Sequence, residues 1–156
     1  AVMYCYIGLS IGDLISGVIS QLVKSRKFVV YLYLVFTLVI TIVFLFFLRE
    51  INQNTYYLMC FFLGVGTGYW AIFVTIAAEQ FGTNIRSTAA NTIPNFVRGS
   101  VNIIVLLFNT FVLVGLNDGI AALIVGIGFM ALALWSLSQL SETFGKDLNY
   151  LETKEG

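Results

Sequence analysis

Five long apolar stretches, separated by short polar segments, run along most of this chain. They cover roughly residues 1–23, 28–48, 56–78, 91–116 and 120–140, and a polar tail, 141–156, follows them. A helix needs about 20 apolar residues to cross the hydrocarbon core of a bilayer, and backbone groups in lipid must pair within the helix. The pattern therefore predicts an all-α, polytopic transmembrane helix bundle of five spans with a polar tail.

Differences among the stretches predict different neighbours. The second has no polar stripe, so we expect lipid on more than one of its sides. The third contains Gly64, Gly66 and Gly68, and glycines spaced at i and i+4 predict close contact with another helix. A nucleotide-binding glycine loop is a weaker alternative, because no strand precedes the glycines and they lie at membrane depth.

The composition supports a membrane environment and excludes several kinds of site. Hydrophobic residues make up 59% of the chain and charged residues 10%, whereas a soluble protein has about 25% charged residues. With zero net charge and no histidine, we expect lipid as a partner, no nucleic acid and no enzymatic activity. Cys5 and Cys60 lie inside apolar stretches and match no metal or disulfide pattern, so we expect neither a metal nor a cofactor.

Basic residues predict the orientation of the bundle. They gather in the loop after the first stretch, the loop after the third and the tail: Lys24, Arg26, Lys27, Arg86, Lys146 and Lys154. These segments share one side if the spans alternate, and the opposite loops contain only Arg49 as a cation. Cytoplasmic loops are rich in Lys and Arg, so we expect a cytoplasmic C-terminus.

The fourth stretch carries the most informative polar pattern. At 100° per residue its polar side chains fall within about 60° of one another; they are Asn91, Asn95, Arg98, Asn102 and Asn109. An arginine facing lipid costs about 2.5–3.5 kcal/mol on insertion scales, so this polar stripe should face protein or water. Two interpretations are open, a substrate path or gated interface, and a structural helix contact made by amides. Arg98 favours the first, because its guanidinium can bind a carboxylate or phosphate.

Asp13 is the acid at membrane depth in the first stretch. On a helix it shares one side, within roughly 80°, with Ser10, Gly17, Gln21 and Lys24. A desolvated carboxyl is suited to carry a proton. An ion pair with Arg98, at similar depth, and a partner outside this chain are the alternatives.

Tyr69, Trp70 and Pro94 have structural and functional interpretations too. Tyr69 and Trp70 follow the glycines of the third stretch, where they are suited to pack in the bundle or to stack on a ligand; packing is the favoured interpretation. Pro94 either kinks the fourth helix or marks its first turn.

Three local patterns resemble the major facilitator superfamily of transporters. Residues 17–27 are similar to the family's loop Gly-x-x-x-Asp-x-x-Gly-Arg-Arg/Lys, with Gln21, Lys24 and Ser25 in place of the acid, the second glycine and the first arginine. Residues 79–89 are similar to its Glu-x-Phe-x-x-x-x-Arg-x-x-Ala stretch. Residues 142–146 resemble the Glu-Thr-x-Gly-Lys sequence after the last span of many sugar and metabolite porters.

In their order and spacing these patterns correspond to spans eight to twelve of the family. The chain begins inside an apolar stretch and shows no signal-peptide features, so we expect it to lack span seven and the N-terminal half. The resemblance implies a partial C-terminal six-helix domain, which would rock against that half around a central site. Spans eight and eleven would flank the interface between the halves, at a separation that argues against a direct Asp13–Arg98 pair.

The resulting hypothesis is a secondary transporter of the bacterial inner membrane, coupled to an ion gradient and moving a small polar metabolite such as a sugar or organic acid. We expect Asn91, Asn95, Arg98, Asn102, Asn109, Tyr69 and Trp70 on the substrate path, and Asp13 in proton or ion coupling. The resemblance implies cytoplasmic gating contacts at Gly17, Gln21, Arg26, Lys27, Glu79 and Arg86, including a Glu79–Arg86 pair. A membrane scaffold without substrate and an integral membrane enzyme are the competing hypotheses.

Overall fold

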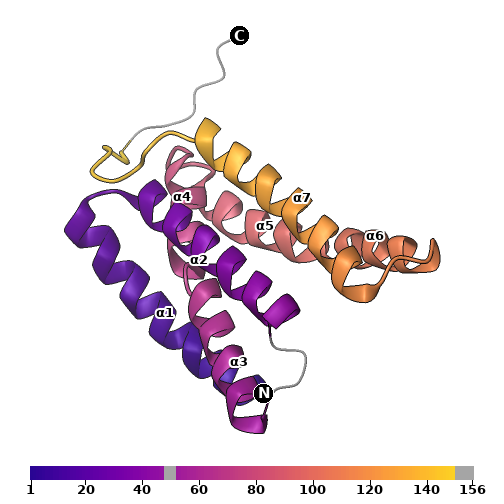
Figure 1. Cartoon of the computed structure of the whole chain (residues 1–156). Helices are drawn as coiled ribbons and strands as arrows, with labels where there is room; N and C mark the ends of the chain where they lie inside the picture. Colours follow the sequence, from indigo (N-terminus) through magenta and orange to yellow (C-terminus); the bar gives the residue numbers. More distant parts are fainter. Residues whose placement is uncertain (48–51, 150–156) are drawn as a thin grey trace.

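Every regular element that the computed structural model describes, in residues 1–47 and 52–149, is an α-helix (Figure 1). The helices are α1 (Val2–Val23), α2 (Arg26–Phe47), α3 (Gln53–Thr67), α4 (Trp70–Glu79), α5 (Arg86–Gly99), α6 (Val101–Leu113) and α7 (Asp118–Gln139). Within these residues five helical stretches are long and apolar enough to cross a membrane: α1, α2, α3 with α4, α5 with α6, and α7. The chain is therefore all-helical and compatible with an integral membrane protein.

The helices differ from the predicted spans mainly at their ends. The fourth span begins at Arg86 rather than near residue 91, because the small and polar residues 87–91 continue the helix without being apolar. Pro94 consequently lies inside α5 and not in its first turn. The predicted end of the second span at Leu48, together with Arg49 and Lys154, lies outside the described residues.

The third span is interrupted, although the sequence predicted one continuous helix. α3 ends at Thr67 and α4 begins at Trp70. The last turn of α3 is tighter than an α-helical turn, because the Gly68 N–H donates to the carbonyl of Val65, three residues earlier, at 2.9 Å. The fourth span is less disturbed between α5 and α6, since the Ser100 N–H still bonds to the carbonyl of Phe96 at 3.0 Å.

The predicted glycine contact is confirmed, and α1 is the helix that makes it. α1 and α3 lie side by side (Figure 1). A Cβ at Gly8 would lie 2.1 Å from the Phe61 carbonyl oxygen, and one at Gly64 would lie 2.1 Å from that of Cys5. Only glycine allows the two backbones to come this close, so these positions fix how α1 and α3 pack.

The apolar core lies between α2, α4 and α7. Its buried side chains are Val29, Val30, Tyr33, Leu34, Ile72, Ile76 and Leu137. The large exposed residues of α2 repeat at helical spacing and form one stripe: Phe28, Leu32, Val35, Val39 and Phe46. The expectation that lipid surrounds α2 on more than one side is therefore wrong for its first half, where the face opposite the stripe fills the core.

The described basic segments meet at one end of the bundle, as the predicted alternation of spans requires. The amide of Gln80 donates to the carbonyl of Ser141 at 3.0 Å. Glu142 accepts hydrogen bonds from the loop before α2. We call this end, where residues 24–27, 79–86 and 140–148 come together, the basic end.

Candidate functional site

The interruption of the third span brings Asp13 of α1 to the first turn of α4. The first N–H groups of a helix have no partner inside it, and non-helical backbone at membrane depth requires burial in protein or a water-filled cavity. Here the Ala71 N–H donates to Asp13 Oδ1 at 3.2 Å. Gly12, the residue before Asp13, allows this approach, because a Cβ at Gly12 would lie 2.5 Å from the Val65 carbonyl oxygen. Gly68 is needed as well, because a Cβ there would lie 2.4 Å from the Gly12 Cα.

Asp13 also lines a polar cavity of about 290 Å³. The cavity extends along α1 and α4 and is lined by Asp13, Gly17, Ser20, Gln21, Arg26, Ala71, Ile72 and Thr75. Helical spacing predicted a polar side of the first span. Three of its residues, Asp13, Gly17 and Gln21, line this cavity. Asp13 makes no ion pair with Arg98 in the described part of the chain, and its hydrogen bond goes to backbone.

Arg98 instead lies on the ring of Trp70, the first residue of α4. The guanidinium carbon is 5.3 Å from the ring centroid, a distance at which a cation and an aromatic face attract one another. Trp70 also packs on Phe73, at 5.4 Å between ring centroids. Two predicted path residues from separate spans therefore meet beside the helix interruption. The exposed Arg98 side chain has no carboxylate partner among the described residues.

Tyr69 takes the packing role that the sequence favoured. Its ring meets that of Tyr33 edge-on at 6.2 Å, and it packs against the apolar core. The Tyr33 hydroxyl in turn donates to the carbonyl of Gly12 at 2.8 Å. Tyr69 thus supports the interruption from inside the bundle, while its neighbour Trp70 faces Arg98.

The asparagines of the polar stripe face away from the rest of the described chain. All four are exposed: Asn91, Asn95, Asn102 and Asn109. The Asn91 amide donates to the carbonyl of Ser87 and the Asn95 amide to that of Asn91, both at 2.9 Å. Because both bonds return to the same helix, no amide contact with another described helix accounts for the stripe.

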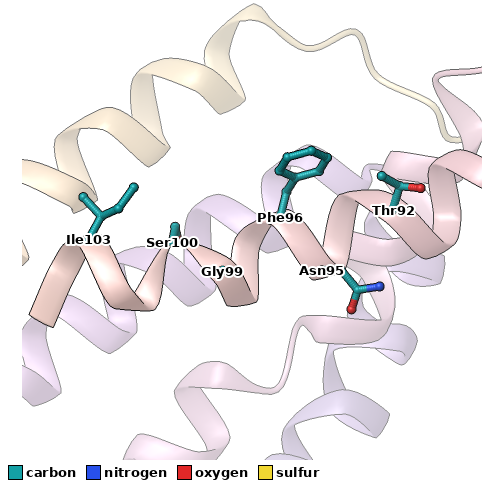
Figure 2. Close-up of a pocket in the computed structure, with 6 residues that line it drawn as sticks. All are labelled: Thr92, Asn95, Phe96, Gly99, Ser100 and Ile103. Carbon is teal, nitrogen blue, oxygen red and sulfur yellow. The ribbon is translucent and has the colours of Figure 1, made fainter.

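A hollow of about 590 Å³ lies beside this stripe on α5 and α6 (Figure 2). It is lined by Thr92, Asn95, Phe96, Gly99, Ser100 and Ile103. Asn95 points to a different side of the helix from Phe96 and Ile103 (Figure 2), so it belongs to both the hollow and the stripe. The face of α5 and α6 that carries the predicted path residues is therefore open and partly concave.

At the basic end, Glu142 joins the tail to the loop before α2. Its carboxylate accepts from the Ser25 hydroxyl at 2.5 Å and from the N–H groups of Arg26 and Lys27 at 3.0 and 3.3 Å. Burial raises the pKa of Glu142, but these hydrogen bonds and one from the Phe144 N–H outweigh it and lower the pKa from 4.5 to about 2. Glu142, a tail residue distant in the sequence, therefore satisfies the first N–H groups of α2.

The predicted Glu79–Arg86 pair is wrong, because each residue has another partner. Glu79 Oε1 lies 2.9 Å from the Arg26 guanidinium at the start of α2. Arg86 donates to the carbonyl of Phe81 at 3.3 Å and also to that of Leu148 in the tail. Lys27 donates to the carbonyls of Ser138 and Leu140 at the end of α7. The predicted gating residues Arg26, Lys27, Glu79 and Arg86 thus connect α2, α4 and the tail.

No family model, curated protein or solved structure matches this chain. The residues and their geometry are therefore the basis for assigning a function.

Two structural features are not among the predictions made from the sequence. One is the role of Glu142, which lies in the tail pattern Glu-Thr-x-Gly-Lys. The other is the role of Gly8 and Gly12, although their spacing of four residues is the same signal that Gly64 and Gly68 give. In the described part of the chain no cluster of His, Cys, Asp or Glu could hold a metal ion, and Cys5 and Cys60 are free thiols.

Proposed function

We propose that this chain is the C-terminal part of a secondary transporter that resembles the major facilitator superfamily. It would move a small polar metabolite by alternating access, driven by an ion gradient, in the bacterial inner membrane with the basic end in the cytoplasm. The missing N-terminal half of the same transporter would cover the polar stripe, with the substrate between the halves. This arrangement supplies a protein or aqueous neighbour for a stripe that has none in the described chain.

The contact of Arg98 with Trp70 at the interrupted third span carries the proposal. Broken helices at membrane depth recur where transporters bind substrates and coupling ions. Here the first turn of α4 contacts both a carboxylate, Asp13, through the Ala71 N–H and a guanidinium without a described carboxylate partner, Arg98, through the Trp70 ring. Arg98 can bind an acidic or hydroxylated substrate, and Asp13 is the candidate for ion coupling.

Uptake by the full-length protein in proteoliposomes tests this function. Arg98→Ala should reduce uptake by about ten- to hundredfold, because a hydrogen bond to a charged group contributes about 1.5–3 kcal/mol. Arg98→Lys should transport faster than Arg98→Ala, because it keeps the positive charge. It should transport more slowly than the unmodified protein, because it loses the forked donors of the guanidinium. Lys24→Gln is the matched control, because it removes an exposed cation at the C-terminal end of α1, eleven residues beyond Asp13, and its uptake should be unchanged.

Two results would contradict transport. One is undiminished uptake by a folded Arg98→Ala protein, which would remove Arg98 from the path. The other is an absence of uptake across a broad panel of sugars, organic acids and amino acids, which would favour a membrane scaffold whose stripe binds a partner protein.

A further inference from the structure

A second cavity, unrelated to the polar stripe, lies near the basic end between α2, α4, α5 and α7. Its volume is about 260 Å³, and its lining is apolar except for one amide: Val30, Phe73, Ile76, Ala77, Gln80, Phe81, Ile93, Leu137 and Leu140. The Gln80 amide is already bonded to Ser141. Water needs two or more polar partners to occupy a cavity, so this space suits an apolar occupant.

The four helices that line this cavity do not all pack extensively against one another. α7 packs against α2 and α6, and α5 packs against α4 and α6. Ile93 of α5 lines the space together with Leu137 of α7 and Leu140 just after it, and among the described residues α5 and α7 do not pack extensively on one another. In a bilayer, lipid chains are the surrounding solvent, and an unfilled apolar space would lose dispersion contacts along its lining.

Two cations lie at the rim of this cavity. Lys27 donates to the carbonyl of Leu140, and Arg86 donates to the carbonyl of Phe81, and both of these carbonyls belong to lining residues. Neither cation has a carboxylate partner among the described residues, in contrast to Arg26, which pairs with Glu79. The nearby Glu142 carboxylate is occupied by the Ser25 hydroxyl and by backbone N–H groups.

We propose that this cavity binds an acyl chain of an anionic phospholipid whose phosphate is held at the rim by Lys27 and Arg86. The apolar lining accommodates the chain, and the two cations select the charge of the headgroup. Basic pockets between helices on the cytoplasmic side of a membrane are suited to anionic lipids. This inference rests on the proposed membrane insertion and orientation, but not on transport.

Lipid-dependent thermal stability of the full-length protein in neutral detergent tests the site. Phosphatidylglycerol should raise the melting temperature saturably, with a midpoint concentration about tenfold lower than that of phosphatidylcholine with the same chains. The double variant Lys27→Gln/Arg86→Gln should bring the two midpoints together. Lys24→Gln, which removes an exposed cation of the same loop, should keep them apart.

The cavity itself is tested by Ile93→Phe, which narrows it from the α5 wall and should weaken the response to both lipids. Equal midpoints for the two lipids in the unmodified protein, or a preference that survives loss of both cations, would overturn the proposal. So would inorganic phosphate that abolishes the preference, because it would indicate a free-anion site. The assay requires no uptake, so failure of transport and failure of lipid binding are separate results.

Discussion

Arg98 differs from the asparagines of its stripe because its side chain reaches a residue on another span. Attraction between an exposed guanidinium and a half-buried indole such as Trp70 is about 0.5–1 kcal/mol. We therefore predict that Arg98→Ala and Trp70→Ala are not additive in the free energy of unfolding. A double-mutant cycle in mixed micelles should give a coupling energy of this size. Strict additivity would mean that the 5.3 Å contact contributes nothing.

Glu142 gives the chain a local sensitivity to acid at the basic end. Its pKa is about 2 when folded, compared with an ordinary value of 4.5, so its contribution is fully present above pH 4.5 and is lost as the pH falls toward 2. Because the side chain is largely exposed, we expect less than about 1 kcal/mol. The melting temperature should decline through this window.

A Glu142→Gln variant should lack this component of the pH dependence. Asp147→Asn is the matched control, because the Asp147 carboxylate bonds within the tail, to the Asn149 N–H, and this variant should behave like the unmodified protein. If Glu142→Gln declines as steeply as the unmodified protein, the hydrogen bonds to residues 25–27 do not stabilise the tail.

At the scale of elements, hydropathy predicted the five spans because it records which stretches are apolar enough to cross a membrane. It could not predict where α5 begins, since residues 87–91 are helical without being apolar. Nor could it predict the break before Trp70, which depends on Gly12 and Asp13 of another helix. The polar stripe predicted a polar neighbour for Arg98, but the Trp70 contact depends on how α4 and α5 pack, and local spacing does not encode that.

The contact between α1 and α3 should be intolerant of side chains. Gly8→Ala would place a Cβ 2.1 Å from the Phe61 carbonyl oxygen, and the backbone shift required should cost about 1–3 kcal/mol. Gly126→Ala in α7 is the control, because no atom lies within 4 Å of its added Cβ, and it should be neutral or stabilising. Equal melting temperatures for the two variants would contradict the packing of α1 on α3.

The interruption between α3 and α4 should depend on an acceptor at position 13. Asp13→Ala leaves the exposed Ala71 N–H without its protein partner, which should cost about 0.5–1.5 kcal/mol, the net contribution of a typical hydrogen bond. Asp13→Asn keeps an acceptor oxygen and should restore most of the stability, while uptake loses its dependence on the proton gradient. Thermal unfolding and uptake measured on both variants separate the structural role of Asp13 from its role in proton coupling. If Asp13→Asn still couples uptake to the proton gradient, the role of Asp13 is only structural.

At the scale of the molecule, the meeting of three basic segments at one end predicts a single orientation in the membrane. With Cys5 and Cys60 replaced by serine, a cysteine at Lys24 should react with an impermeant thiol reagent only in inverted vesicles. A cysteine at Asn117, in the loop before α7, should react only in intact cells. Labelling of both positions from the same side would contradict the alternation of spans.

The placement of Trp70 beneath Arg98 also gives the protein a built-in optical reporter. This chain contains two tryptophans, so replacing Trp135 with phenylalanine leaves, within the chain, one indole whose emission is governed by a neighbouring positive charge. Any solute that draws the guanidinium away from the ring will change that fluorescence. Candidate substrates can therefore be screened on purified material by titration, before any flux assay is available.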